Sequence, residues 1–81
     1  MSLIFTYNGT YMTVQCKGND TLNSVFDKYC GKAGFPKNEP TFYYNEQKIV
    51  GDYKTIIEHG IPDKAVFNVV ISKYVQGAKI N

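Results

Sequence analysis

DTLNSVFDKYCGKAGFP, at residues 20–36, is the stretch that decides the fold, and TFYY at 41–44 and QKI at 47–49 follow it. Apolar side chains recur in it at helical spacing, which predicts an amphipathic helix with one buried stripe: Leu22, Val25, Phe26, Tyr29, Cys30 and Ala33. Gly34 is placed to end this helix in the left-handed conformation, and Pro36 prevents it from resuming. The stretch therefore predicts a helix, its stop, a turn and then a strand.

The chain begins with a predicted β-hairpin from Leu3 to Lys17. Its turn is Asn8-Gly9, the dipeptide that type I′ turns favour because both central residues need a positive φ. A two-residue turn fixes the register, and the period of two then places one apolar set on a single face: Leu3, Phe5, Met12, Val14 and Cys16. We expect that face to be part of the core.

Asn19 or Asp20 is expected to cap the helix with its side-chain oxygen. Further strands are expected at Thr41–Tyr44, Lys48–Val50 and Ala65–Ser72. Between the last two of these strands, three isoleucines are expected to attach a compact loop to the core: Ile56, Ile57 and Ile61. In the last strand Phe67, Val69 and Ile71 are expected to face inward.

The element order is ββαβ(β)β, which predicts an α+β fold. One helix with one apolar stripe and one sheet with one apolar face bury both surfaces when the helix lies across the sheet. We expect a mixed sheet of four or five strands in which the first and last strands are central and parallel. Residues 1–72 would form the domain, and residues 73–81 a flexible tail.

Composition narrows the class of protein. With 81 residues the chain is long enough for one modest core, and 20% charged residues with a net charge of +2 argue against disorder. The chain lacks the cluster of basic residues that is expected of a nucleic-acid-binding protein. It also has no apolar run long enough to span a membrane, and no secretory signal pattern at its start. Cys16 and Cys30 indicate reduced thiols in a cytosolic or nuclear protein, and one bridge between them is the alternative.

Residues that could carry chemistry are few. Cys16 and Cys30 fall on predicted core faces, where a thiolate is disfavoured. His59 is the single histidine, and we expect it to tie its loop by a hydrogen bond. The carboxylates do not pair within a predicted cleft, and the glycines occur singly at turns. We therefore expect neither an enzyme nor a metal or cofactor site.

The chain from Leu3 to Ile71 resembles the ubiquitin-like (β-grasp) superfamily. The similarity lies in residues that keep their order and spacing: Asp20-Thr21-Leu22, Val25, Tyr29, Gly34-Phe35-Pro36, Phe42, Ile49, Thr55-Ile56, Ile61 and Phe67-Asn68-Val69-Val70. A second set resembles the SUMO branch: Tyr29-Cys30, Gly34, Pro36, Asn38, Phe42, Tyr44, Gln47 and Ile49. The resemblance implies a ubiquitin-like fold and a function that depends on binding by other proteins.

The resemblance, together with strand periodicity, points to a binding patch on the exposed sheet face at Tyr43, Lys48, Asn68 and Val70. Tyr43 stands where ubiquitin carries an aliphatic recognition residue and Asn68 where it carries histidine, whereas Val70 is kept. An exposed aromatic beside a valine resembles an interaction hot spot. The expected function is a monomeric, non-covalent protein-interaction module, with partners from the ubiquitin or SUMO system; the structural alternative is ordinary sheet packing.

SUMO-like domains also take an extended peptide beside their second strand, which implies a groove at Thr13, Gln15, Lys17, Lys28 and Lys32. An edge strand offers free N–H and C=O groups for this purpose. The alternative is a solvated edge with scattered lysines.

The rival function is a covalent modifier made as a precursor and trimmed after Gly77. Conjugated relatives end in Gly-Gly, whereas one glycine is present here and residues 78–81 follow it. Gln47 and Asp63 stand at the positions of ubiquitin's best-known chain-forming lysines, although Lys48 is adjacent to the first.

Overall fold

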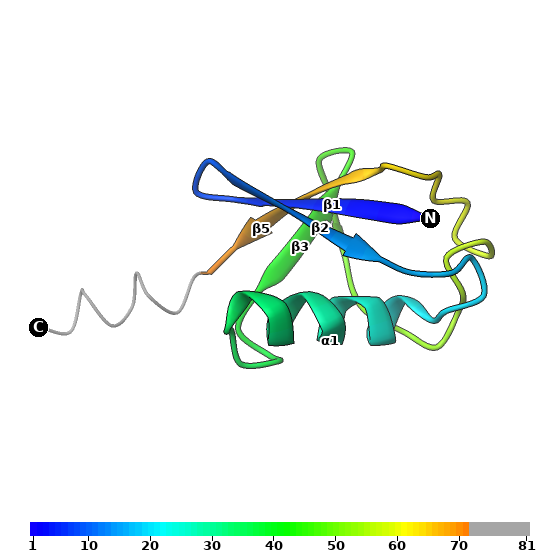
Figure 1. The fold of residues 1–81 in the computed structure, drawn as a ribbon, viewed down its shortest axis with the longest axis horizontal. Coiled ribbons are helices and arrows are strands. Elements are labelled where there is room, and N and C mark those ends of the chain that lie inside the picture. The colour runs from blue at the N-terminus through cyan, green and yellow to red at the C-terminus, as the bar shows by residue number, and fades with distance from the viewer. Residues whose placement is uncertain (72–81) are drawn as a thin grey trace, which may run out of the picture.

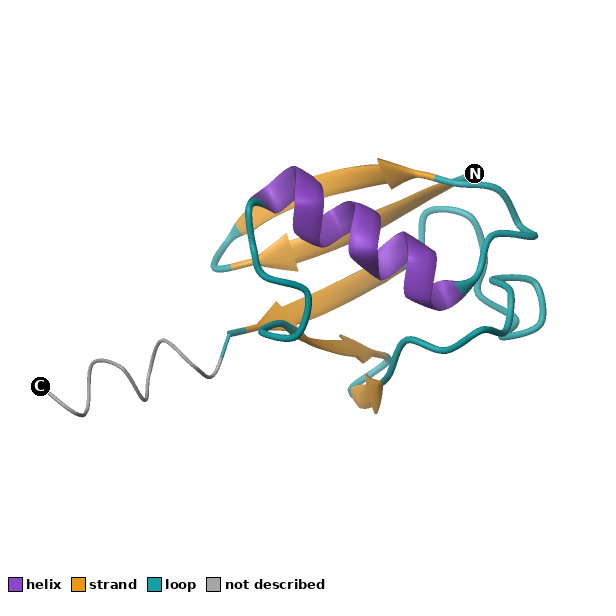
Figure 2. Ribbon diagram, turned by 90° about the horizontal axis from the view of Figure 1, so that it is seen from below, coloured by secondary structure: helices purple, strands orange, loops and turns teal. Residues whose placement is uncertain are grey.

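A computed structural model describes residues 1–71 and shows a five-stranded mixed sheet with one helix packed across one face, a β-grasp-like α+β fold (Figure 1). The elements are β1 (Ser2–Tyr7), β2 (Thr10–Gln15), α1 (Leu22–Ala33), β3 (Thr41–Tyr44), β4 (Gln47–Ile49) and β5 (Val66–Val70). The strand order is β2-β1-β5-β3-β4. Figure 2, seen from below, shows α1 in front of the sheet and crossing its strands, so that one face of the sheet packs against the helix.

The β1–β2 hairpin has the predicted register, with Tyr7 opposite Thr10 and Leu3 opposite Val14. Asn8 and Gly9 have φ values of 53° and 83°, as a two-residue turn of type I′ requires. β1 and β5 are central and parallel, with Phe5 paired with Phe67. Both expectations are confirmed.

The helix ends as predicted and begins one or two residues later than predicted. Gly34 has φ 84°, and its N–H donates to the carbonyl of Cys30 at 2.8 Å. The N-cap is Thr21, whose Oγ1 accepts from the N–H of Ser24 at 3.2 Å, so the prediction of Asn19 or Asp20 is wrong. The Asp20 carboxylate instead accepts from the N–H of Lys17 at 2.9 Å and closes the turn that precedes the helix.

The core lies between the sheet and α1 and is built from stacked rings. Phe5 stacks on Tyr29 at 4.4 Å and on Phe67 at 5.1 Å between ring centroids, and Phe26 stacks on Phe42 at 3.9 Å. The cysteines behave as small core residues. Cys16 and Cys30 are both buried and free, so no bridge joins them.

The loop between β4 and β5 is attached to the core by two of its three isoleucines. Ile56 and Ile61 are buried, whereas Ile57 is 70% exposed, so the prediction that it anchors the loop is wrong. Ile57 lies instead against Gly18 at the surface, where an added Cβ on the glycine would meet its side chain at 2.6 Å. His59 ties the loop as expected, through Nε2 at 2.9 Å from Oδ1 of Asp52.

Two strand boundaries differ from the prediction. β4 covers Gln47–Ile49 instead of Lys48–Val50, and β5 covers Val66–Val70 instead of Ala65–Ser72. The first shift follows from a two-residue turn, Asn45-Glu46, which places Gln47 directly opposite Tyr44. Phe67, Val69 and Ile71 are buried as predicted. No helix among residues 1–71 is long and apolar enough to cross a membrane.

The β3–β4 turn carries a strained residue. Glu46 has φ 66°, a left-handed conformation that side chains with a Cβ disfavour. We expect Glu46→Gly to raise the free energy of unfolding by about 1 kcal/mol, because glycine removes this strain. Urea denaturation measures the change. Gly9→Ala, at φ 83° with open space around the added Cβ, is the matched control and should lower stability by a similar amount. A loss of stability in Glu46→Gly would contradict the assignment of strain.

Three surface carboxyls have pKa values below their ordinary range. The side-chain hydrogen bond from His59 lowers the pKa of Asp52, and backbone N–H donors lower the pKa values of Asp20 and Glu58. Groups with a depressed pKa stabilise the fold above their unfolded pKa of about 4. That stability is lost as the pH falls through the folded values. We expect the urea midpoint to fall steeply below about pH 4.

Asp52→Asn tests the contribution of the Asp52–His59 contact to this acid dependence. The variant should show a shallower fall in the urea midpoint at low pH, because its side chain no longer releases a proton on folding. Glu46→Gln, at an exposed turn position, is the control and should follow the parent protein. An acid dependence unchanged in Asp52→Asn would show that this contact does not couple stability to pH.

Candidate functional site

The predicted patch residues on the outer face of the sheet are brought together by strand register. Tyr43 on β3 lies directly opposite Asn68 on β5 and Lys48 on β4. Asn68 in turn lies beside Thr6 on β1, and Thr6 is opposite Tyr11 on β2. These five residues form one cross-strand row that spans all five strands. We call the surface around this row the outer face.

Valines border this row. Val66 and Val70 flank Asn68 along β5 and are 44% and 43% exposed, and Val70 is opposite Thr41. Lys48 carries the one charge among the strand residues that register places on the outer face, all of which lie within residues 1–71. The outer face thus carries tyrosines, valines, threonines and an asparagine, and it shares its tyrosine content and its scarcity of charge with the centres of protein interfaces.

The two adjacent tyrosines of β3 have separate environments. Tyr44 faces the core side and stacks on Phe67 at 5.1 Å. Tyr43 faces the opposite way and is half-buried among its strand neighbours. Their opposite orientation, expected from the period of two, presents Tyr43 on the outer face beside Asn68, the central residue of the row.

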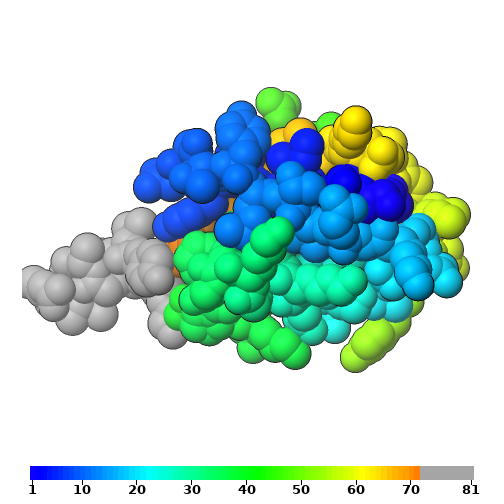
Figure 3. All heavy atoms as spheres, viewed as in Figure 1, coloured from blue at the N-terminus to red at the C-terminus, as the bar shows by residue number. Residues whose placement is uncertain are grey.

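The second predicted site, the groove at β2, is an open edge with partly engaged lysines. Lys32 donates from Nζ to the carbonyl oxygen of Thr13 at 2.7 Å, and Lys28 lies 3.7 Å from the Asp20 carboxylate. Gln15 and Lys17 are exposed at the end of the strand. Figure 3 shows β2 and α1 against each other on this side of the molecule.

The backbone of β2 alternates between bonding to β1 and facing the open edge. Met1 and Cys16 exchange two backbone hydrogen bonds, at 2.8 and 2.9 Å. Because hydrogen-bonded and non-hydrogen-bonded pairs alternate in antiparallel strands, the N–H and C=O groups of Tyr11, Thr13 and Gln15 point outward. Lys32 therefore covers one of the acceptors that an added strand would use.

A small apolar pit that the sequence did not indicate lies at the hairpin end of this groove. Its volume is about 180 Å³, and its lining comes from β1, β2, the end of α1 and the residues after it: Tyr7, Thr10, Met12, Tyr29, Ala33 and Phe35. Tyr7 and Phe35 meet edge to face at 5.2 Å. The pit forms because Phe35, beyond the helix stop, returns to the hairpin, and no local pattern specifies that contact.

Groups that could act as nucleophiles are held in unreactive surroundings. Burial raises the pKa of the Cys16 thiol and of the Cys30 thiol, which disfavours the thiolate. Among residues 1–71, no three His, Cys, Asp or Glu side chains gather as a metal-binding group. Gly77, the predicted processing point, lies outside the described residues.

No protein-family model matches the chain, and no curated protein matches it in sequence. The fold and the chemistry of its surfaces are therefore the observations from which a function is inferred.

Proposed function

We propose that the protein is a ubiquitin-like domain that acts as a non-covalent protein-interaction module and binds its partner through the outer face. The observation that supports this most is the cross-strand row, which gathers Tyr43, Asn68 and Lys48 from three adjacent strands. The row places one aromatic side chain between an amide and an ammonium group, on a face otherwise almost free of charge.

The outer face has the physical features of a binding surface. Tyrosine contributes a large contact area at a low cost in conformational entropy, and its hydroxyl keeps a hydrogen-bonding partner available. The flanking Val66 and Val70 leave apolar surface in water that a partner would cover. Lys48 sits at the edge of the row, where a charge at the rim guides orientation more than affinity.

The link to the ubiquitin or SUMO system rests on the resemblance of the core and turn residues. We infer a monomeric domain of the cytosol or nucleus, with no enzymatic activity, cofactor, nucleic acid or membrane of its own. The partner would be a protein whose contact surface is apolar at its centre and carries an acidic group opposite Lys48.

Tyr43→Ala tests the proposal. Proteins recovered from the source cell with the purified domain would be expressed and their affinities measured directly by calorimetry. Removal of a central aromatic should weaken such a partner by about 2 kcal/mol, roughly thirtyfold. Circular dichroism should show an unchanged fold. Tyr53→Ala, at a tyrosine that is 85% exposed on the β4–β5 loop, is the matched control and should leave affinity unchanged. Partners that bind Tyr43→Ala as tightly as the parent would refute the outer face as the site.

The groove between β2 and α1 is a second candidate for binding, and the apolar pit is the observation that favours it. A peptide strand added to β2 could place one apolar side chain in the pit while Lys17 and Lys28 face its acidic residues. It would have to displace Lys32 from the Thr13 carbonyl.

The intact mass of the endogenous protein distinguishes an interaction module from a covalent modifier. We expect residues 78–81 to be retained in the endogenous chain, because the interaction module needs no free terminal glycine. A mature end at Gly77, or Gly77 joined to lysines of other proteins, would establish the modifier instead. Gly77→Ala would then abolish the adducts and leave outer-face binding intact.

A further inference from the structure

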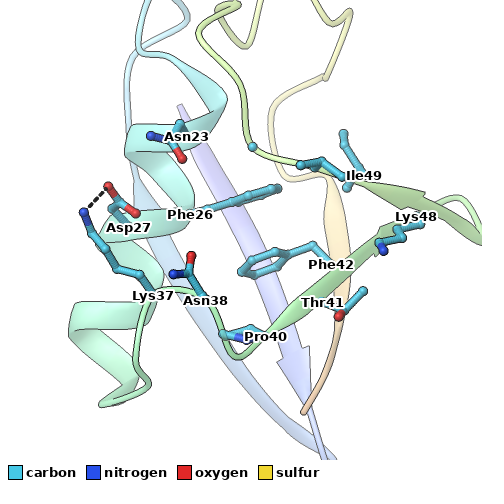
Figure 4. Close-up of a pocket in the computed structure, with 12 residues that line it drawn as sticks. Asn23, Phe26, Asp27, Lys37, Asn38, Pro40, Thr41, Phe42, Lys48 and Ile49 are labelled. Atoms are coloured by element: carbon cyan, nitrogen blue, oxygen red, sulfur yellow. Dashed lines mark ion pairs between the residues drawn. The ribbon is translucent and has the colours of Figure 1, made fainter. Parts of the chain in front are cut away.

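A cleft of about 490 Å³ lies between α1 and β4 and borders the outer face at Thr41 and Lys48 (Figure 4). Phe26 and Phe42, stacked at 3.9 Å, form its floor. At one end the N–H of Asn23 donates to the carbonyl of Asp52 at 3.0 Å, and at the other the Lys37 ammonium lies 3.2 Å from the Asp27 carboxylate. These contacts hold α1 to the segments around the cleft, and Lys48, Ile49 and Val50 line it on the β4 side.

The strand that lines this cleft, β4, has an unpaired edge. β4 is last in the sheet order, and the two-residue Asn45-Glu46 turn makes Tyr44 and Gln47 a hydrogen-bonded pair. Alternation along an antiparallel pair then makes Tyr43 and Lys48 a non-hydrogen-bonded pair. The backbone N–H and C=O of Lys48 therefore point away from β3, toward the edge that the cleft follows.

The groups around the opening suit an extended peptide. The amide side chains of Asn23 and Asn38 line the cleft on its helix and loop sides, and each offers both a donor and an acceptor for a peptide backbone. Val50, 68% exposed, and Ile49 supply apolar surface next to the Phe26–Phe42 floor.

The charges at the opening select the kind of peptide. Asp27, the carboxylate of the cleft, is already paired with Lys37. Lys48, on the β4 side, forms no ion pair among residues 1–71, so an occupant with an acidic side chain would neutralise it. Lys37 lies across the opening but is paired with Asp27, so Lys48 supplies the net positive charge of the cleft.

We propose that the β4 edge and this cleft bind an extended acidic peptide as an additional strand. The peptide backbone bonds to the N–H and C=O of Lys48, an apolar side chain lies on Val50 and the aromatic floor, and a carboxylate meets the Lys48 ammonium. The site shares the Lys48 ammonium with the outer face, but its strand edge and its aromatic floor take no part in the function proposed for the outer face.

The test uses the full chain labelled with ¹⁵N and two blocked heptapeptides, one alternating valine with glutamate and the other alternating valine with lysine. In NMR titrations at millimolar peptide, the glutamate peptide should shift the backbone amide of Lys48 and the side-chain amides of Asn23 and Asn38. It should also slow hydrogen exchange at the Lys48 amide. The lysine peptide should bind at least about tenfold more weakly.

Two variants at Lys48 distinguish the contribution of its backbone N–H from that of its side-chain charge. Lys48→Pro removes an N–H that β3 does not use, so the sheet should persist while peptide binding is lost. Lys48→Glu keeps the N–H and should reverse the preference toward the lysine peptide, which supplies a test even where the proline variant fails to fold. Tyr43→Ala, which disables the outer face, should leave this binding unchanged.

Three results would overturn the proposal. They are no shift at millimolar glutamate peptide, equal affinity for the two peptides, and shifts confined to the β2 edge at Tyr11 and Thr13 or to the outer face at Val66 and Asn68. Since Tyr43→Ala removes the outer-face aromatic and leaves Lys48 and the β4 backbone in place, failure here is distinguishable from failure of the proposed function.

Discussion

The Phe5 ring is the contact on which the rest of the structure depends. It stacks on Tyr29 of α1 and Phe67 of β5, and it meets Phe26 and Phe42 edge to face at 6.1 and 5.7 Å. Such aromatic pairs contribute about 0.5–1.5 kcal/mol each beyond the burial of their area. One fully buried side chain of β1 therefore joins the helix to both halves of the sheet.

The placement of the surfaces follows from that core. With α1 filling one side of the sheet, the outer face is left to solvent, and the period of two then decides that Tyr43 and not Tyr44 is presented there. The strand order leaves β2 and β4 as the two edges. The first is longer and partly covered by Lys32, whereas the second is short and borders the cleft. The two edges therefore differ because of the residues of α1 and of the loops beside them, and not because of the sheet itself.

Local chemistry was enough to predict most of the fold. Asn8-Gly9 fixed the hairpin register, and Gly34 fixed the helix end, because positive φ restricts which residues fit. The N-cap prediction was wrong because the Asp20 side chain, although of a type that often caps helices, accepts a hydrogen bond in the turn before the helix. The positions on the outer face could be predicted from the alternation of side chains along each strand. The pit and the cleft could not, because both depend on where the segment after α1 packs against the rest of the domain. The contact of Phe35 with Tyr7 is an example.

The parallel pairing of β1 with β5 has a consequence for synthesis of the chain on the ribosome. Phe5 is made among the first residues, but the strand that carries its partner Phe67 is the last element of the described domain. Until that strand has left the ribosome, the sheet is split into two hairpins with an open gap between β1 and β3, and the rings of the core are exposed. The nascent domain therefore folds late and as one unit, and chains that stop before Val66 should be substrates for chaperones and proteases.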